Sequence, residues 1–397
     1  MVSFTTIAQG IALVSILIMR SEAAPAVSGV DAKVISGNET FTVSPIEGTV
    51  SLPAITFEEL PPIIADRVVP VTNPEFIADL NSETRIIAEN RQIFAANGGN
   101  LTRLERREVT NVASTGLTFT VPANAPPATF LASSSVTTAT TAQITKFKLF
   151  SAIAATTYCD SVTISKQWTC TYCKKYVPDG KIIVAFETAK HKIGGVLLRS
   201  DLQKTIFVVF RGSSNLDNWI TNLEFIRGSY TPVSGASAHI GFYNAYKEAS
   251  TYFFPQFLAQ HKAYPTYKVA VTGHSLGAAQ AVLGAMDIYQ RVATINKSNL
   301  SIYTGGCPRI GNDDFAYYVD ATKVPHYRSV HNRDIVPHVP PQALGYYHPG
   351  IEVWTKTATT GQLCSGIEND ACSNSIVPFT STEDHRTYYG MVNGACS

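Results

Sequence analysis

The chain lacks a prevailing charge. Its 31 lysine and arginine residues nearly balance 30 aspartate and glutamate residues, and only 15% of the 397 residues are charged. Without a basic excess, the sequence gives no reason to expect binding to nucleic acid or to an anionic membrane surface. Low charge together with 45% hydrophobic residues argues against disorder overall. The length suffices for one large core or two smaller ones.

Beyond its N-terminus the sequence also lacks any apolar run that approaches eighteen residues, so we expect a mature protein without a transmembrane segment. The run IAQGIALVSILIM (7–19) is short for a membrane span and is followed by the small residues of RSEAAPA. This order is typical of a secretory signal, which we place at residues 1–23. No positive charge precedes the run, and a buried helix is the alternative. Sequons that allow glycosylation of a secreted chain are Asn38, Asn100, Asn296 and Asn299.

No cysteine precedes position 159. The seven that the chain contains are Cys159, Cys170, Cys173, Cys307, Cys364, Cys372 and Cys396. In an oxidising compartment six of them pair and one is left over, but spacing does not choose the connectivity. The CxxC at 170–173 fits a redox motif or half of a zinc site. Because neither a second CxxC nor an HExxH motif is present, we favour a structural disulfide and expect neither a metal nor an organic cofactor.

The first third of the chain differs in amino-acid composition from the rest. It has no cysteine or tryptophan up to about residue 132, and it ends in the low-complexity stretch PANAPPATFLASSSVTTATT (122–141). The dibasic pair Arg106-Arg107 is a type of site that secretory proteases cut. We therefore predict a propeptide at residues 24–131 and a catalytic domain at 132–397. An N-terminal extension that is never removed is the alternative.

From about residue 141 the pattern becomes globular. Buried-strand runs are found at 204–212, 267–273, 299–306 and 327–332, and helical segments lie between them at 239–262 and 276–292. Strands that alternate with helices of this length predict an α/β fold with a sheet that is parallel in its centre.

One of these strand-to-helix turns carries the sequence GHSLG. Gly273 and Gly277 lie two residues on either side of Ser275, and glycines at these positions let the strand and the helix approach closely around a strained, exposed serine. The backbone N–H of Leu276 lies at the helix N-terminus, where it can stabilise an oxyanion. The motif predicts a nucleophilic serine.

A nucleophilic serine needs a histidine base and an orienting acid, which follow it in that fold in the order acid, then histidine. Asp334 comes directly after a predicted strand, at the carboxyl end where such sites assemble. His385 lies in a late loop. From pattern alone this pair competes with other downstream acids and with four other histidines, which are His326, His331, His338 and His348. His274 adjoins the serine, and we expect it to have a structural role.

Several longer motifs occur in order from about residue 141 to 396. They are FRGSS, HIGF, GHSLG, NRDIVPHVPP, CSNSIVPF and a late DH. In these the chain resembles the secreted fungal class 3 lipases of the Rhizopus/Rhizomucor type. The resemblance implies an α/β-hydrolase-type, mostly parallel central sheet with flanking helices and a short helical lid. It implies Ser275 as the nucleophile, Asp334 as the acid and His385 as the base.

The resemblance also implies further features of the site. Ser213 and Leu276 form the oxyanion hole, and the disulfides are Cys159–Cys396, Cys170–Cys173 and Cys364–Cys372. The partners are a triacylglycerol substrate at the lipid–water interface and the chain's own propeptide.

After Ser213 the sequence SNLDNWITNLEF has an apolar stripe at helical spacing, formed by Leu216, Trp219, Ile220 and Leu223. An ordinary surface helix is one interpretation of the stripe. Its position directly after the oxyanion serine favours a lid over the site, as the resemblance implies.

The sequence departs from the family pattern in two places. Ala278 follows GHSLG where members of the family usually have glycine, and some feruloyl esterases of the same fold also have alanine there. Cys307 is an additional, unpaired cysteine. Ala278 keeps a second interpretation open, a carboxylesterase for feruloyl or other soluble esters. A non-catalytic lipid-binding protein is a third, against which Ser275, Asp334 and His385 argue. We expect a secreted serine ester hydrolase, a triacylglycerol lipase.

Overall fold

The computed structural model describes residues 55–71, 82–104, 121–128 and 133–396. The predicted signal at 1–23, the sequon Asn38 and the dibasic pair at 106–107 lie outside the described residues. Among the described helices, none combines the length and apolar character that a membrane crossing requires.

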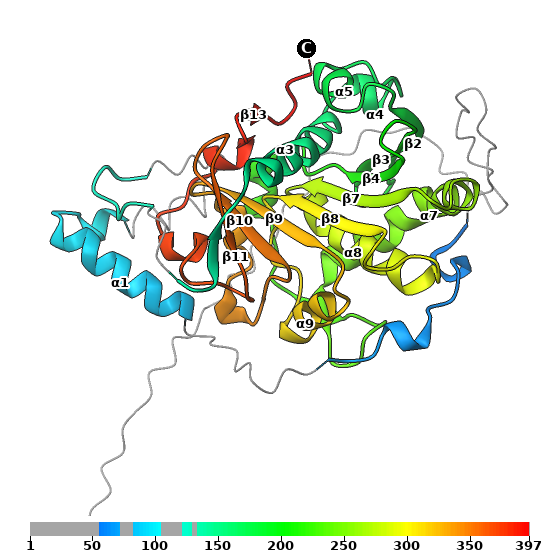
Figure 1. The fold of residues 1–397 in the computed structure, drawn as a ribbon. Coiled ribbons are helices and arrows are strands. Elements are labelled where there is room, and N and C mark those ends of the chain that lie inside the picture. Colours follow the sequence, from blue (N-terminus) through cyan, green and yellow to red (C-terminus); the bar gives the residue numbers. More distant parts are fainter. Residues whose placement is uncertain (1–54, 72–81, 105–120, 129–132, 397) are drawn as a thin grey trace, which may run out of the picture. The chain divides into compact units, whose positions relative to one another are not determined.

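A nine-stranded sheet forms the centre of the catalytic region (Figure 1), with the strand order β1-β11-β10-β9-β8-β7-β4-β3-β2. The pairs from β4 through β7, β8 and β9 to β10 are parallel, and those at both margins are antiparallel. The mostly parallel α/β sheet predicted from the sequence is thus confirmed. Its strands are β1 (Val136–Thr138), β2 (Lys181–Glu187), β3 (Gly194–Ser200), β4 (Thr205–Phe210), β7 (Lys268–His274), β8 (Leu300–Gly305), β9 (His326–His331), β10 (Ile351–Thr355) and β11 (Gly361–Cys364).

Within the described residues, four short strands lie outside this sheet. They form two antiparallel pairs, β5 (Arg227–Ser229) with β6 (Ser237–His239) and β12 (Thr387–Tyr388) with β13 (Met391–Val392).

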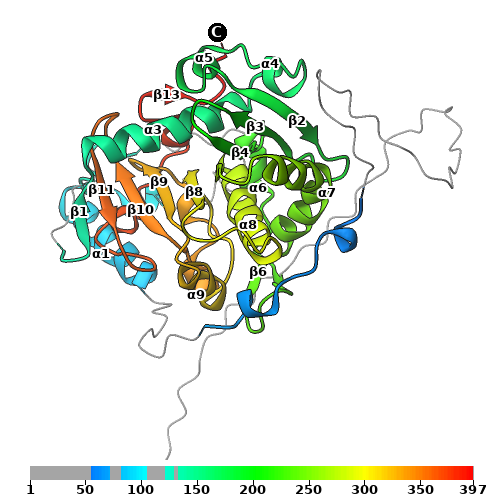
Figure 2. The same ribbon diagram turned by 45° about the vertical axis from the view of Figure 1, so that its right-hand side comes forward.

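Helices cover both faces of the sheet (Figure 2). The helices α3 (Thr141–Thr156), α4 (Asp160–Thr163) and α5 (Thr171–Tyr176) pack on one face, and α7 (Ile240–Ala263), α8 (Leu276–Arg291) and α9 (Asp313–Ala321) pack on the other. Other helices of the described residues include α1 (Ser82–Ala96) and α6 (Leu216–Thr221).

The alternating side chains of β4 show why the central strands are hydrophobic throughout. Ile206, Val208 and Phe210 belong to the core beneath α7 and α8, whereas Phe207 and Val209 belong to the core beneath α3. A strand with both faces buried needs apolar residues at every position, which explains the continuous run that the sequence shows.

The segment before residue 132 contacts the catalytic region through α1. Asn90 Nδ2 donates to the carbonyl oxygens of Ser375 (2.9 Å) and Val377 (2.7 Å), and the rings of Phe94 and Phe379 lie 5.2 Å apart. Ser375 belongs to the 3-10 helix η5 (Ser373–Ile376), which precedes the loop that carries His385. The segment with propeptide texture therefore packs on this part of the catalytic region.

The three disulfides that the resemblance implies are present, namely Cys159–Cys396, Cys170–Cys173 and Cys364–Cys372. Cys307 is a free, buried thiol. Because every bonded cysteine lies after residue 132, the covalent framework belongs entirely to the catalytic region.

Candidate active site

Ser275 occupies the turn between β7 and α8, at the carboxyl end of a central strand. Its backbone is strained, with φ 60° and ψ −133°. A Cβ atom on Gly273 would lie 2.2 Å from the carbonyl oxygen of Gly277, and one on Gly277 would lie 2.4 Å from that of Phe210. Only glycine fits at either position, as the sequence predicted.

Asp334 and His385 lie in contact, although 51 residues separate them. His385 Nδ1 lies 2.8 Å from Asp334 Oδ2. The carboxylate also accepts hydrogen bonds from the Val336 N–H, at 2.8 Å, and from the Tyr388 hydroxyl. Full burial alone would raise the pKa of Asp334, but the charge of His385 and the hydrogen bonds from these three residues outweigh it and hold the pKa below its usual value. Asp334 is therefore held as a carboxylate.

The imidazole of His385 lies beside the serine turn. The Ser275 N–H donates to the Gly305 carbonyl oxygen at 3.0 Å, and a Cβ on the next residue, Gly306, would lie 2.5 Å from His385 Cε1. Both Ser275 Oγ and His385 Nε2 are buried without a hydrogen-bond partner among the described residues. Neither of these two atoms is therefore engaged by another group of the described chain, as a nucleophile and its base require.

A second histidine supports the first. His274 Nε2 donates to the carbonyl oxygen of His385, and its Nδ1 accepts from the Tyr158 hydroxyl, each at 2.9 Å. The two imidazole rings lie 4.3 Å apart. Burial and the charge of His385 hold the pKa of His274 well below its usual value, so its ring is neutral. The expected structural role of His274 agrees with these contacts.

Sequence reasoning missed Tyr388 and Tyr158 as parts of this site. Tyr388 lies three residues after His385, a spacing that carried too weak a signal to single it out. Tyr158 comes from α3's C-terminal side, far from the serine in sequence, and nothing local to it indicated the contact with His274.

The loop after β4 brings Ser213 to the serine turn. A Cβ on Gly212 would lie 2.6 Å from the His274 carbonyl oxygen and 2.8 Å from Ser275 Cβ, so the backbones touch here. Leu276 is the first residue of α8, where backbone N–H groups lack intrahelical partners. The structure therefore places both predicted oxyanion residues next to Ser275.

The predicted lid stripe lies on α6, but the helix is shorter than the stripe. It begins after Asn215, whose Oδ1 accepts from the Asn218 N–H at 3.0 Å, and ends at Thr221. Asn222 Nδ2 donates to the Asn218 carbonyl oxygen at 2.8 Å and closes the helix. The prediction that Leu223 belongs to the helix was wrong, because this cap ends the helix two residues before Leu223.

The four stripe residues nevertheless share an environment. All are partly exposed, and two of them, Trp219 and Leu223, pack against the core beneath α7 and α8. The ring of Trp219 stacks on that of Phe242 with centroids 6.3 Å apart.

The competing histidines lie elsewhere. His326, His338 and His348 are fully buried, and burial together with neighbouring arginines lowers their pKa, to about 3 for His326 and His338. His331 Nδ1 contacts the Asp384 carbonyl oxygen at 2.9 Å. The structure brings none of these side chains to Ser275.

The two departures from the family pattern are both core positions. Ala278 is fully buried on α8, and Cys307 is 1% exposed, where burial raises the pKa of its thiol to about 12. Neither side chain is available to a substrate, so neither favours the soluble-ester interpretation.

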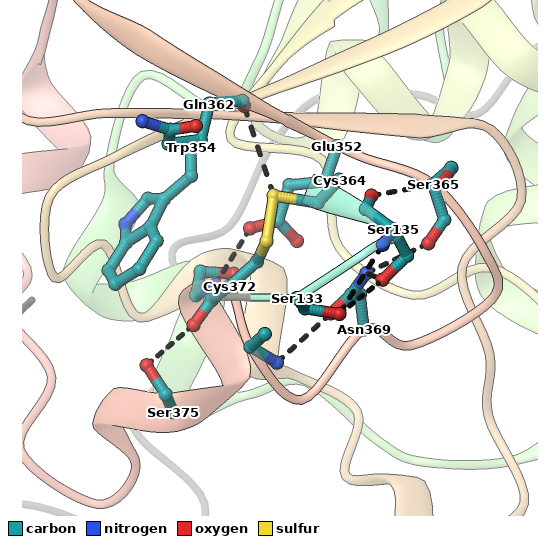
Figure 3. The surroundings of a disulfide bond; sticks show 12 residues. Ser133, Ser135, Glu352, Trp354, Gln362, Cys364, Ser365, Asn369, Cys372 and Ser375 are labelled. Carbon is teal, nitrogen blue, oxygen red and sulfur yellow. Dashed lines mark hydrogen bonds between the residues drawn. A yellow bond between two sulfur atoms is a disulfide. The ribbon is translucent and has the colours of Figure 1, made fainter. Parts of the chain in front are cut away.

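One group of metal-ligating residue types lies close together in the described chain, formed by Glu352, Cys364 and Cys372. Its two sulfur atoms form a disulfide (Figure 3), which removes them as metal ligands. Glu352 Oε1 accepts from the Ser373 N–H at 2.8 Å, and Oε2 faces Arg328 at 3.4 Å. These contacts identify the group as a structural cluster.

Comparisons with known proteins point in one direction. A family model described as Lipase (class 3) matches residues 207–344. A lipase of Rhizopus niveus is 44% identical over 408 residues, which covers 100% of both chains. The native propeptide complex of Rhizomucor miehei lipase has a TM-score of 0.70 and 38% identity, and covers 85% of this chain and 100% of that one. A triacylglycerol lipase described as having a serine protease triad as its catalytic centre has a TM-score of 0.64 and 45% identity, with 66% and 100% covered.

Proposed function

The chain belongs to the class 3 lipase family, and from that premise we propose that Ser275, His385 and Asp334 hydrolyse the ester bonds of triacylglycerols. The observation that carries this assignment is the 2.8 Å contact between His385 Nδ1 and Asp334 Oδ2. Within the described residues, His385 Nε2 and Ser275 Oγ have no hydrogen-bond partner and are available for the reaction. The triacylglycerol substrate is the one named for a solved relative of 45% identity.

In the proposed reaction His385 Nε2 takes the proton of Ser275 as Oγ attacks the ester carbonyl carbon. Asp334 fixes the tautomer that carries the proton on Nδ1 and stabilises the imidazolium that forms. His385 then gives its proton to the departing alcohol, which leaves an acyl group on Ser275. A water molecule, deprotonated by the same imidazole, releases the fatty acid and restores the serine.

The negative charge that develops on the carbonyl oxygen needs donors that are already in place. The backbone N–H of Leu276 opens α8, and its helix dipole favours negative charge at this end. Ser213 supplies the second donor from the loop that touches Ser275. We assign the oxyanion hole to these two residues.

We assign the role of a lid to residues 214–223. The stripe formed by Leu216, Trp219, Ile220 and Leu223 is apolar and partly exposed, a costly arrangement in water at about 25 cal/mol per Å². A lipid surface removes that cost, so the open state becomes more populated when the substrate aggregates.

Secretion and removal of a propeptide complete the proposal. The sequence before residue 132 has the composition of a propeptide; Asn90 packs on η5 and Phe94 packs on Phe379. A solved relative of 38% identity is a lipase–propeptide complex. We expect the secreted enzyme to begin near residue 132, and N-terminal sequencing that finds residues near Ala24 would contradict removal.

The decisive experiment replaces Ser275 with alanine. Loss of the nucleophile should reduce the hydrolysis of tributyrin emulsions by several powers of ten, with secretion and unfolding temperature unchanged. Retention of more than about a tenth of the activity would refute the assignment. Hydrolysis of methyl ferulate in parallel with tributyrin separates the lipase from a soluble-ester carboxylesterase.

A further inference from the structure

The motif HIGF at 239–242 has no part in the mechanism above. His239 ends β6 and caps the N-terminus of α7, and only 5% of its surface is exposed. It lies in contact with the chain that leaves the lid, so its contacts bear on how the lid is attached.

Both nitrogen atoms of the His239 ring are hydrogen-bonded to backbone groups. Nδ1 accepts from the Phe242 N–H at 3.2 Å, and Nε2 contacts the carbonyl oxygen of Glu224. An N–H can only donate and a carbonyl oxygen can only accept. The ring is therefore neutral, with its proton on Nε2, and burial lowers its pKa in the same direction.

Glu224 marks the boundary between two differently held segments. In the described part of the chain, the hydrogen bonds of residues 213–223 stay within that segment. After Glu224 the backbone is fixed, because the Ile240 N–H donates to the Ile226 carbonyl oxygen at 3.0 Å and Arg227 pairs with His239 in the β5–β6 ladder. The bond from His239 comes first in this series.

The same ring also lies beneath the lid helix. His239 stacks on Phe242, with centroids 3.9 Å apart and planes at 16°, and Phe242 stacks on Trp219. His239 therefore contacts the lid region in two ways, through Phe242 in this aromatic stack and through the hydrogen bond to the Glu224 carbonyl oxygen.

We propose that His239 is a positioning residue that fixes the C-terminal hinge of the lid at Glu224. This inference rests on the lid proposed above. With Glu224 held, motion is confined to residues before it, and the lid returns to the same seat on Phe242. Without the bond, the flexible segment extends towards β5. The closed lid, packed on Phe242, is then less stable relative to open positions in water.

Two substitutions separate the two bonds of the ring. In His239→Asn the amide oxygen takes the place of Nδ1 and keeps the cap of α7, but nothing reaches Glu224. In His239→Gln the amide nitrogen reaches the place of Nε2 and keeps the bond to Glu224. His261→Asn is the matched control, because this buried histidine lies near the other end of α7, with Nε2 2.7 Å from Thr294 Oγ1.

The measurement is the ratio of tributyrin hydrolysis above and below its solubility limit, together with the unfolding temperature. Loss of one hydrogen bond predicts a ratio about fivefold lower in His239→Asn, through higher activity on dissolved substrate. His239→Gln and His261→Asn should keep the ratio of the unmodified enzyme. An unchanged ratio in His239→Asn, or equal losses in the Asn and Gln variants, would overturn the inference.

The lid proposal fails in a different way. If the unmodified enzyme itself shows no jump at the solubility limit, the lid and the hinge are both refuted, whereas a jump that His239→Asn preserves refutes only the hinge. Retention of activity in Ser275→Ala would contradict the catalytic assignment instead and would leave the hinge test unaffected.

Discussion

Asp334 and the lid segment both follow carboxyl ends of parallel strands, β9 and β4, but the Asp334–His385 pair and the lid are held in different ways. Asp334 is fully buried and accepts hydrogen bonds from three residues. In the described chain, residues 213–223 hydrogen-bond among themselves and pack on the domain through apolar contacts, chiefly those of Trp219 and Leu223.

The difference corresponds to what each part has to do. Hydrogen bonds are directional and hold an imidazole at a fixed angle, as proton transfer requires. Apolar contacts are non-directional, and a lipid surface can replace them at little cost. The site thus combines the Asp334–His385 pair, which is rigid before the substrate arrives, with a lid whose apolar contacts a lipid surface can replace.

The largest effect is expected from breaking the rigid part. Asp334→Asn preserves the shape of the side chain but favours the wrong tautomer of His385, and kcat should fall by about 10⁴ on dissolved and emulsified esters alike. Asp384→Asn is the matched control, since Asp384 Oδ2 bonds Asn332 at 3.0 Å and not the His385 ring. Near-normal activity in Asp334→Asn would assign the acid to another carboxylate.

Tyr388→Phe should have a smaller effect on the same pair. The hydroxyl of Tyr388 is one of the donors that lower the pKa of Asp334, so its removal raises that pKa and makes the carboxylate easier to protonate. The acid limb of the kcat/KM profile should therefore move to higher pH, and kcat should fall by about tenfold.

The substitution Tyr389→Phe, at the neighbouring position, is the control for this prediction. The hydroxyl of Tyr389 bonds Ser329 Oγ at 2.8 Å and does not touch Asp334. Tyr389→Phe should leave the acid limb unchanged. The same shift in both variants would mean that the limb reports general destabilisation and not the pKa of Asp334.

The sequence predicted those parts of this arrangement that depend on local pattern. The central strands follow from continuous β-branched and aromatic runs, as in β4, and Ser275 follows from the glycines that flank it. The hydrogen bonds of Tyr158 and Tyr388 were not predictable, because each joins residues that only the folded sheet brings together.

The choice of Asp334 and His385 among competing residues also needed more than local pattern. Five histidines and several acids follow Ser275, and composition and spacing do not distinguish a buried neutral histidine such as His338 from a base. The resemblance to known lipases made that choice, and the 2.8 Å contact agrees with it. The end of α6 was misplaced because amphipathic spacing continues through Leu223, whereas the Asn222 cap ends the helix.

The smallest effect is expected from the lid, where Trp219→Ala removes one face of the stack on Phe242. When the lid opens, the indole ring contacts the lipid surface, and losing about 1 kcal/mol of that contact should lower hydrolysis of long-chain emulsions by about threefold to fivefold. Dissolved esters should lose less, because the lid does not have to meet a lipid surface for them. Leu202→Ala, which removes an exposed apolar side chain between β3 and β4, is the control and should change neither rate. Equal losses on both substrates would reduce residues 214–223 to an ordinary surface segment, and the contrast with the rigid pair would then have no functional meaning.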